Sequence, residues 1–122
     1  MSKRKRMKRE RIQQVAASFM SKLSERLSLF GLVFQFFTRT SSTGTLYVSV
    51  CTCLPDGGFR KGGGVTVRFS DHSRKGDHWA NFSRPARQFY GIWCFTPPAK
   101  VEQKTTRIML EILKRNKEEG EA

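Results

Sequence analysis

The sequence predicts an α+β fold with an N-terminal amphipathic helix, a four-stranded antiparallel sheet and a C-terminal helix. Two segments repeat apolar residues every three or four positions, the spacing of one helix face. Between them, four segments are rich in β-branched and aromatic residues. The connections between these segments look too short for helical crossovers, so we expect antiparallel strands with both helices on one face. The 122 residues divide into a basic arm (1–11), which is either mobile or a frayed first helical turn, one domain (12–117) and a charged tail (118–122).

The first helix is expected to begin at Ile12 and to run for about five turns. Its polar positions share the opposite face, and Gly31 is the expected stop because glycine enters the left-handed conformation without a Cβ clash. The apolar stripe consists of Ile12, Val15, Ala16, Phe19, Leu23, Leu27 and Phe30.

Four strands are expected at Leu32–Arg39, Thr45–Leu54, Val65–Ser70 and Gln88–Thr96. The first two form a hairpin around a polar loop. In the second and third strands apolar and polar residues alternate, as in a sheet with one covered face. The glycine-rich residues 57–64 are expected to form a flexible loop, and the polar residues 71–87 a long irregular one.

The second helix follows Pro97 and Pro98, which end the last strand. Its apolar stripe consists of Val101, Thr105, Ile108, Met109, Ile112 and Leu113.

The charge of the chain points to a polyanionic partner. There are 23 Lys and Arg residues against 10 Asp and Glu, a net charge of +13. Residues 1–30 carry +7, residues 31–99 carry +5 and residues 100–122 carry +1, so the excess lies in the N-terminal part and the middle. Such a charge attracts nucleic acid, and we expect DNA or RNA to be bound through phosphate contacts with little sequence specificity.

The basic residues of the arm and of the central loops interleave with aromatic ones, a composition typical of grooves that track phosphates and stack bases. The residues expected to contact nucleic acid are Lys3, Arg4, Lys5, Arg6, Lys8, Arg9, Arg11, Arg60, Lys61, Arg68, Arg74, Lys75, Trp79, Arg84 and Arg87.

One alternative is a metal-free endoribonuclease, although we favour the hypothesis of a binding protein over that of an enzyme. The chain holds two histidines, both in the polar loop, with Asp71, Asp77 and several arginines nearby. A histidine can act as general acid or base, and arginine can stabilise a charged phosphate transition state. The catalytic residues of this alternative are His72, His78, Arg68 and Arg74.

A further alternative is an interaction protein that inhibits a host nucleoprotein complex. Its docking surface would be the aromatic cluster of Phe34, Phe36 and Phe37. A basic amphipathic helix could instead lie on an anionic membrane surface.

Cofactors and metals are not expected. Cys51, Cys53 and Cys94 are few and odd in number, which disfavours a disulfide scaffold and favours a reducing compartment. A C-x-C pair on one strand divides between its two faces and is poorly suited to zinc. No apolar stretch reaches the ~20 residues that span a bilayer. We therefore expect a cytoplasmic protein, associated with the nucleoid if its partner is DNA.

Residues 65–72, Val-Thr-Val-Arg-Phe-Ser-Asp-His, resemble a V-R-x-S-D-H signature of small domains in phage and plasmid proteins. The matching positions are Arg68, Ser70, Asp71 and His72. The resemblance covers only the central strands, and it implies a mobile-element protein with a role around nucleic acid or host defence.

Overall fold

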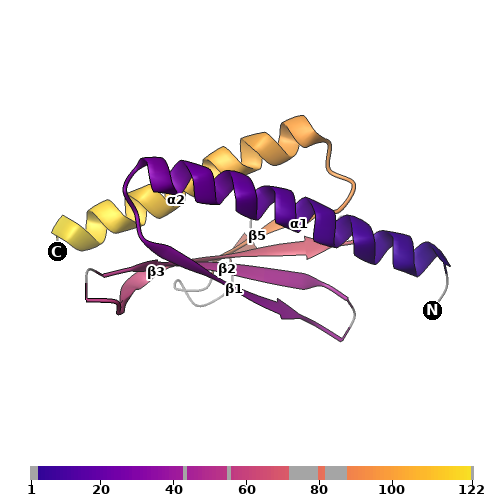
Figure 1. Cartoon of the computed structure of the whole chain (residues 1–122), viewed down its shortest axis with the longest axis horizontal. Coiled ribbons are helices and arrows are strands. Elements are labelled where there is room, and N and C mark those ends of the chain that lie inside the picture. Colours follow the sequence, from indigo (N-terminus) through magenta and orange to yellow (C-terminus); the bar gives the residue numbers. More distant parts are fainter. Residues whose placement is uncertain (1–2, 43, 55, 72–79, 82–87, 122) are drawn as a thin grey trace.

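Two helices cover one face of a five-stranded sheet in the computed structural model of the chain (Figure 1). The structure describes residues 3–42, 44–54, 56–71, 80–81 and 88–121. The α+β class is confirmed. The elements are α1 (Lys3–Leu29), β1 (Phe34–Thr40), β2 (Leu46–Cys53), β3 (Phe59–Ser70), β4 (Ala80–Asn81), β5 (Gln88–Trp93) and α2 (Pro98–Glu121).

The sheet is mixed, so the prediction of a four-stranded antiparallel sheet is wrong in part. Its strand order is β1-β2-β3-β5-β4, and the pairs β1–β2, β2–β3 and β4–β5 are antiparallel. The strands β3 and β5 are parallel, with Arg68 opposite Gly91 and Phe69 opposite Ile92. A parallel pair needs a connection of a dozen or more residues, and residues 71–87 are long enough to provide one.

The glycine-rich stretch belongs to β3 and is not a separate loop, contrary to expectation. The turn between β2 and β3 is tight: Gly57 has a φ of 92°, and the Asp56 carboxylate accepts a hydrogen bond from the Gly58 N–H at 2.9 Å. Gly64 pairs with Cys51, and the register shifts between Cys51 and Cys53. Glycine within a strand is compatible with such an irregularity because it has no side chain to pack.

Helix α1 begins at Lys3, so the segment expected to be a basic arm forms its first turns. Its end is as predicted. Gly31 has a φ of 71°, its N–H donates to the Ser28 carbonyl at 3.0 Å, and the Leu32 N–H donates to the Leu27 carbonyl at 3.2 Å. This pair of bonds caps the helix. Phe30 lies beyond the last turn and is exposed rather than part of the buried stripe.

The core lies between the helices and the sheet. Val48, Val50, Val65 and Val67 are all buried on the face that the helices cover. Phe69 joins them, and its ring centroid is 5.4 Å from that of Phe19 on α1. The alternation predicted for β2 and β3 is therefore confirmed.

The predicted stripe of α2 is also confirmed. Its residues Val101, Thr105, Ile108 and Ile112 are buried and Met109 packs against the core, whereas Leu113, also expected in the stripe, is only partly buried. The helix continues through most of the expected charged tail to Glu121. Within the described residues, neither helix is long and apolar enough to cross a membrane.

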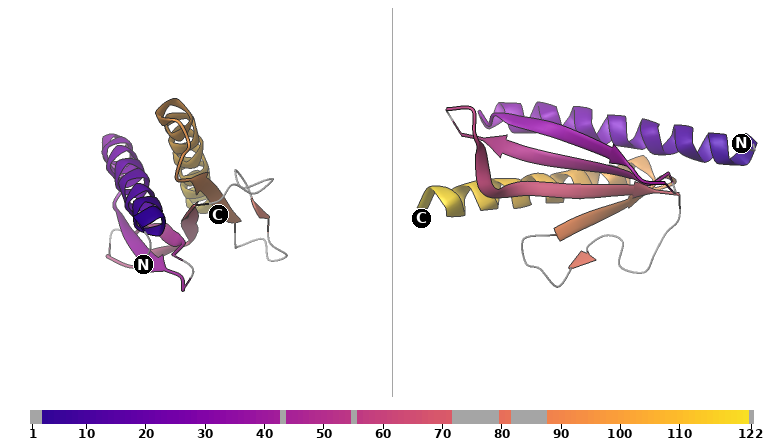
Figure 2. Two further views of the ribbon diagram at one scale, coloured as in Figure 1. Left: turned by 90° about the vertical axis from the view of Figure 1, so that its right-hand side faces the viewer. Right: turned by 90° about the horizontal axis from the view of Figure 1, so that it is seen from below.

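The two helices lie side by side and run in the same direction (Figure 2). Lys22 and Arg26 of α1 contact Glu102 and Thr106 of α2, so successive turns of the two helices match. The starts of both helices therefore lie at one end of the sheet, where β3 and β5 also end. This end carries the first part of the candidate site.

Candidate nucleic-acid interface

The first turns of α1 concentrate positive charge at one end of the molecule. Residues 3–11 include seven Lys or Arg residues and one Glu. Figure 1 shows the start of α1 extending past the ends of the strands. There is no acidic residue in the first helical turn, so the positive end of the helix dipole adds to the basic side chains. This arrangement disfavours the helix on its own and favours a bound anion.

A pocket of about 260 Å³ opens where this basic segment meets the turn between β1 and β2. Arg9, Thr40 and Ser41 are among the residues that line it, and the Ser41 hydroxyl accepts a hydrogen bond from the Thr45 N–H at 3.1 Å. A guanidinium and hydroxyls are the donors that commonly bind phosphate oxygens. The other lining residues are Ile12, Gln13, Gly44 and Leu46.

Arg11 holds α1 against the end of the sheet. Its Nε donates a hydrogen bond to the Cys94 carbonyl at 3.0 Å. The Cys94 N–H in turn donates to the Ser70 carbonyl, at 2.8 Å. Arg11 therefore has a structural contact in addition to its predicted role, and it places the basic helix start beside the ends of β3 and β5.

A second part of the candidate site lies on the sheet face opposite the helices. The register aligns Arg39, Tyr47 and Arg68 in one row across β1, β2 and β3. The Arg39 guanidinium lies over the Tyr47 ring, 4.9 Å from its centroid, within the range of a cation–π interaction. Two basic groups and an aromatic ring thus share one row of the sheet.

The neighbouring row consists of Phe37, Ser49 and Thr66. The Ser49 and Thr66 hydroxyls are hydrogen-bonded at 2.9 Å, and the Phe37 side chain is 47% exposed. The residues expected from the sequence to contact nucleic acid include neither Phe37 nor Arg39. The alternation of β1 could have indicated both residues, because it places them on the face of the sheet opposite to that of Phe34 and Phe36.

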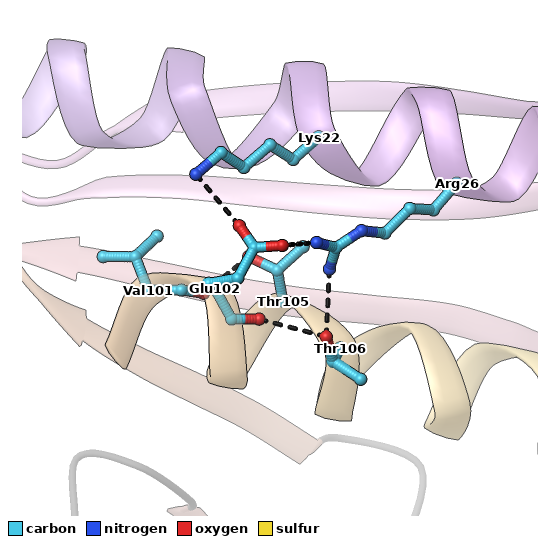
Figure 3. A network of polar contacts seen from close by, with 6 residues as sticks. All are labelled: Lys22, Arg26, Val101, Glu102, Thr105 and Thr106. Atoms are coloured by element: carbon cyan, nitrogen blue, oxygen red, sulfur yellow. Dashed lines mark hydrogen bonds and ion pairs between the residues drawn. The ribbon is translucent and has the colours of Figure 1, made fainter. Parts of the chain in front are cut away.

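Other basic residues are engaged in holding the helices together (Figure 3). Glu102 of α2 forms ion pairs with Lys22, at 3.0 Å, and with Arg26. Arg26 also donates to the Thr106 hydroxyl at 3.0 Å. These two cations act within the helix layer, as no sequence pattern had indicated.

Two basic residues of α2 bind the sheet. The Lys104 ammonium donates to the Gly91 carbonyl at 3.0 Å. Arg115 pairs with Glu111 at 3.0 Å and donates to the Gly64 carbonyl at 2.5 Å. The nearly neutral C-terminal segment therefore uses part of its charge for the fold.

The predicted site residues fall into three groups. Those of α1 and Arg68 lie on the two surfaces just described, whereas Arg60 and Lys61 lie in the first half of β3. The others lie outside the described residues: Lys75, Trp79, Arg84, Arg87, and three of the four candidate catalytic residues, His72, His78 and Arg74.

The aromatic docking surface expected at β1 is divided between the two faces of the sheet. Phe34 and Phe36 pack against the core, with their ring centroids 5.5 Å apart. Phe37 lies on the other face. The three rings therefore do not form one surface.

The cysteines are unpaired thiols. Burial raises the pKa of the Cys51 thiol, and nearby Cys53 raises it further. Burial also raises the pKa of Cys94, and Asp71 adds to this effect while Arg11 opposes it. Among the described residues, no three His, Cys, Asp or Glu side chains are grouped so that they could hold a metal ion.

The class defined by these features is an α+β domain with two parallel helices on one sheet face and basic and aromatic residues on the other. No known protein family matches the chain, and neither the curated proteins nor the solved structures include a match. The local resemblance of residues 65–72 to phage and plasmid domains stays a prediction.

Proposed function

We propose that this protein binds nucleic acid through phosphate contacts with little sequence specificity. The observation that carries the proposal is the start of α1, where seven basic residues lie on one helix end that extends past the sheet. Several cations elsewhere are paired with Glu102 or Glu111, whereas the sequence of residues 3–11 offers one Glu for seven Lys or Arg residues. The resemblance at residues 65–72 supports a mobile-element protein acting on such a partner.

The mechanism is electrostatic. Each Lys or Arg that neutralises a phosphate releases condensed counterions, which favours binding at low salt and weakens it steeply as salt rises. Backbone contacts of this kind fix the orientation of a protein on the nucleic acid but do not read its sequence. Little preference among sequences of equal length is expected.

The test is a titration of labelled single-stranded RNA and duplex DNA at several salt concentrations, with the strands checked on a gel afterwards. We expect affinity to fall strongly between low and physiological salt while the strands stay intact. Affinity that hardly changes with salt would contradict the proposal. Shortened strands would instead favour the nuclease alternative of His72 and His78.

Two matched variants distinguish the effect of where the positive charge lies from the effect of the total charge. One variant changes Lys3, Arg4, Lys5 and Arg6 to Gln, and the other changes the exposed Lys100, Arg107, Lys114 and Lys117 to Gln. Both lose four positive charges. We expect the α1 variant to lower the slope of log affinity against log salt by up to about 3 on a single strand, and the α2 variant to change it little. Equal effects would show that net charge alone matters.

A further inference from the structure

We infer that the sheet face opposite the helices binds a single-stranded nucleic acid, with unpaired bases against Phe37 and Tyr47 and phosphates against Arg39 and Arg68. This inference rests on the proposed function and adds to it the class of nucleic acid and the surface that selects it. The basic start of α1 attracts any polyanion, whereas this face has the side chains to distinguish a single strand from a duplex.

The charge of this face suits a polyanion. On β1, β2 and β3, the paired positions on this face are Gln35, Phe37, Arg39, Tyr47, Ser49, Cys51, Gly64, Thr66 and Arg68, and on β5 Phe89 and Gly91 pair with Thr66 and Arg68. None of these described residues is acidic, and two are arginines. On the helix side, by contrast, Glu102 and Glu111 accompany the basic residues.

The aromatic residues of this face suit bases. Phe37 lies in the middle of an edge strand and is 47% exposed, although Phe34 and Phe36 on the same strand pack against the core. Tyr47 lies one strand further in and two residues along in register, beside Arg39. An exposed aromatic ring that is surrounded by basic residues can stack on a base, and every base has a face on which a ring can stack.

A duplex cannot use these rings because its bases are already stacked and paired. In a single strand the bases are unpaired, so they can turn towards the sheet while the phosphates meet the arginines. The Ser49 and Thr66 hydroxyls between the rows add polar contacts without charge. The prediction that follows is a preference for single strands that depends on the rings.

The experiment measures dissociation constants of the full-length protein for a labelled oligo-uridine, an oligo-thymidine and a duplex DNA at several salt concentrations. The variants are Phe37→Ala, Arg39→Gln and Tyr47→Thr. Their controls are Phe30→Ala, an exposed ring at the α1–β1 corner, Arg107→Gln, an exposed charge on α2, and Tyr47→Phe, which keeps the ring. Circular dichroism confirms that each variant is folded.

We expect Phe37→Ala and Tyr47→Thr each to weaken single-strand binding roughly tenfold and to leave duplex binding within about twofold. Arg39→Gln should lower the salt slope by about 0.7 on a single strand. The three controls should bind like the unmodified protein.

Single-strand affinities of Phe37→Ala and Arg39→Gln within twofold of their controls would overturn the inference. If the variant of Lys3, Arg4, Lys5 and Arg6 still lost affinity, the proposed function would stand and only the inference about the sheet face would fall. If the unmodified protein bound neither single strands nor duplex, both would fall. Loss of oligo-uridine binding alone among the ring variants would restrict the single strand to RNA.

Discussion

The two faces of the central sheet are built from the same strands but differ in composition and in exposure. On β2 and β3 the helix side carries Val48, Val50, Val65 and Val67, all buried, whereas the other side carries Tyr47, Ser49, Thr66 and Arg68, all partly exposed. Because alternate side chains of a strand point to opposite faces, neighbouring residues can serve stability and binding separately. Substitutions on the two faces should therefore have separable effects.

The largest expected effect is a difference in stability between two Phe→Ala variants, one on each face of the sheet. Phe69→Ala removes a ring that is fully buried against Phe19, and it should lower the free energy of unfolding by about 3–5 kcal/mol. Phe37→Ala removes a ring that is 47% exposed, and it should cost about 1 kcal/mol or less. Urea denaturation of both variants measures the difference. Similar losses would mean that the far face is also part of the core.

A smaller effect is expected where the helix side contains a buried polar pair. The Thr52 hydroxyl donates to the Asn116 Oδ1 at 3.0 Å, and among the described residues the Asn116 Nδ2 has no hydrogen-bond partner. Thr52→Val leaves the Oδ1 unsatisfied as well and should cost about 1–2 kcal/mol. The double variant with Asn116→Leu should recover most of this loss in the same denaturation assay. A double variant less stable than Thr52→Val would refute this account.

The helix-layer ion pairs should contribute less. Glu102→Gln removes the partner of Lys22 and Arg26, whose side chains are partly exposed, so we expect a loss of roughly 0.5–1 kcal/mol that shrinks as salt rises. Thermal unfolding at low and high salt measures it, with Glu25→Gln, an exposed residue of α1, as the control. Single-strand affinity should stay within about twofold. A larger gain in affinity would place Lys22 and Arg26 in the binding surface.

The smallest effect concerns the thiols. The pKa of Cys51 is raised above its usual 9.0 by burial and by Cys53, so above that pH the folded chain binds more protons than the unfolded chain. The free energy of unfolding should therefore fall slightly as pH rises past about 9. Denaturation at pH 8 and pH 10 tests this, and Cys51→Ser should reduce the change. The same decline in Cys51→Ser as in the unmodified protein would exclude this thiol as its source.

The periodic parts of the fold could be predicted from the sequence. The α1 stripe from Ile12 to Leu27 and the alternation around Val48 and Val67 are local patterns, set by which face of an element is covered. Gly31 could be identified as the helix stop for a similarly local reason. Helix α1 begins earlier than predicted because the basic residues before Ile12 have good intrinsic helix propensity even though they repel one another.

Strand order could not be predicted in the same way. The parallel pairing of β3 with β5 depends on where the chain returns after Ser70, and no local pattern of residues 88–93 specifies its neighbour. The candidate site divided similarly. Clusters such as Lys3–Arg11 are visible as composition, whereas the row of Arg39, Tyr47 and Arg68 joins three strands and needs the register.

The central claim is that one face of the sheet holds the fold together and the other, with the start of α1, binds nucleic acid. Backbone amide NMR spectra of the labelled protein, recorded during titration with a short oligo-uridine, test this most directly. We predict shifts at Lys8, Arg9, Phe37, Arg39 and Tyr47, with Arg107 and Leu110 on the outer side of α2 unchanged. Shifts confined to α2, or to the exposed corner at Leu29–Val33, would contradict the account.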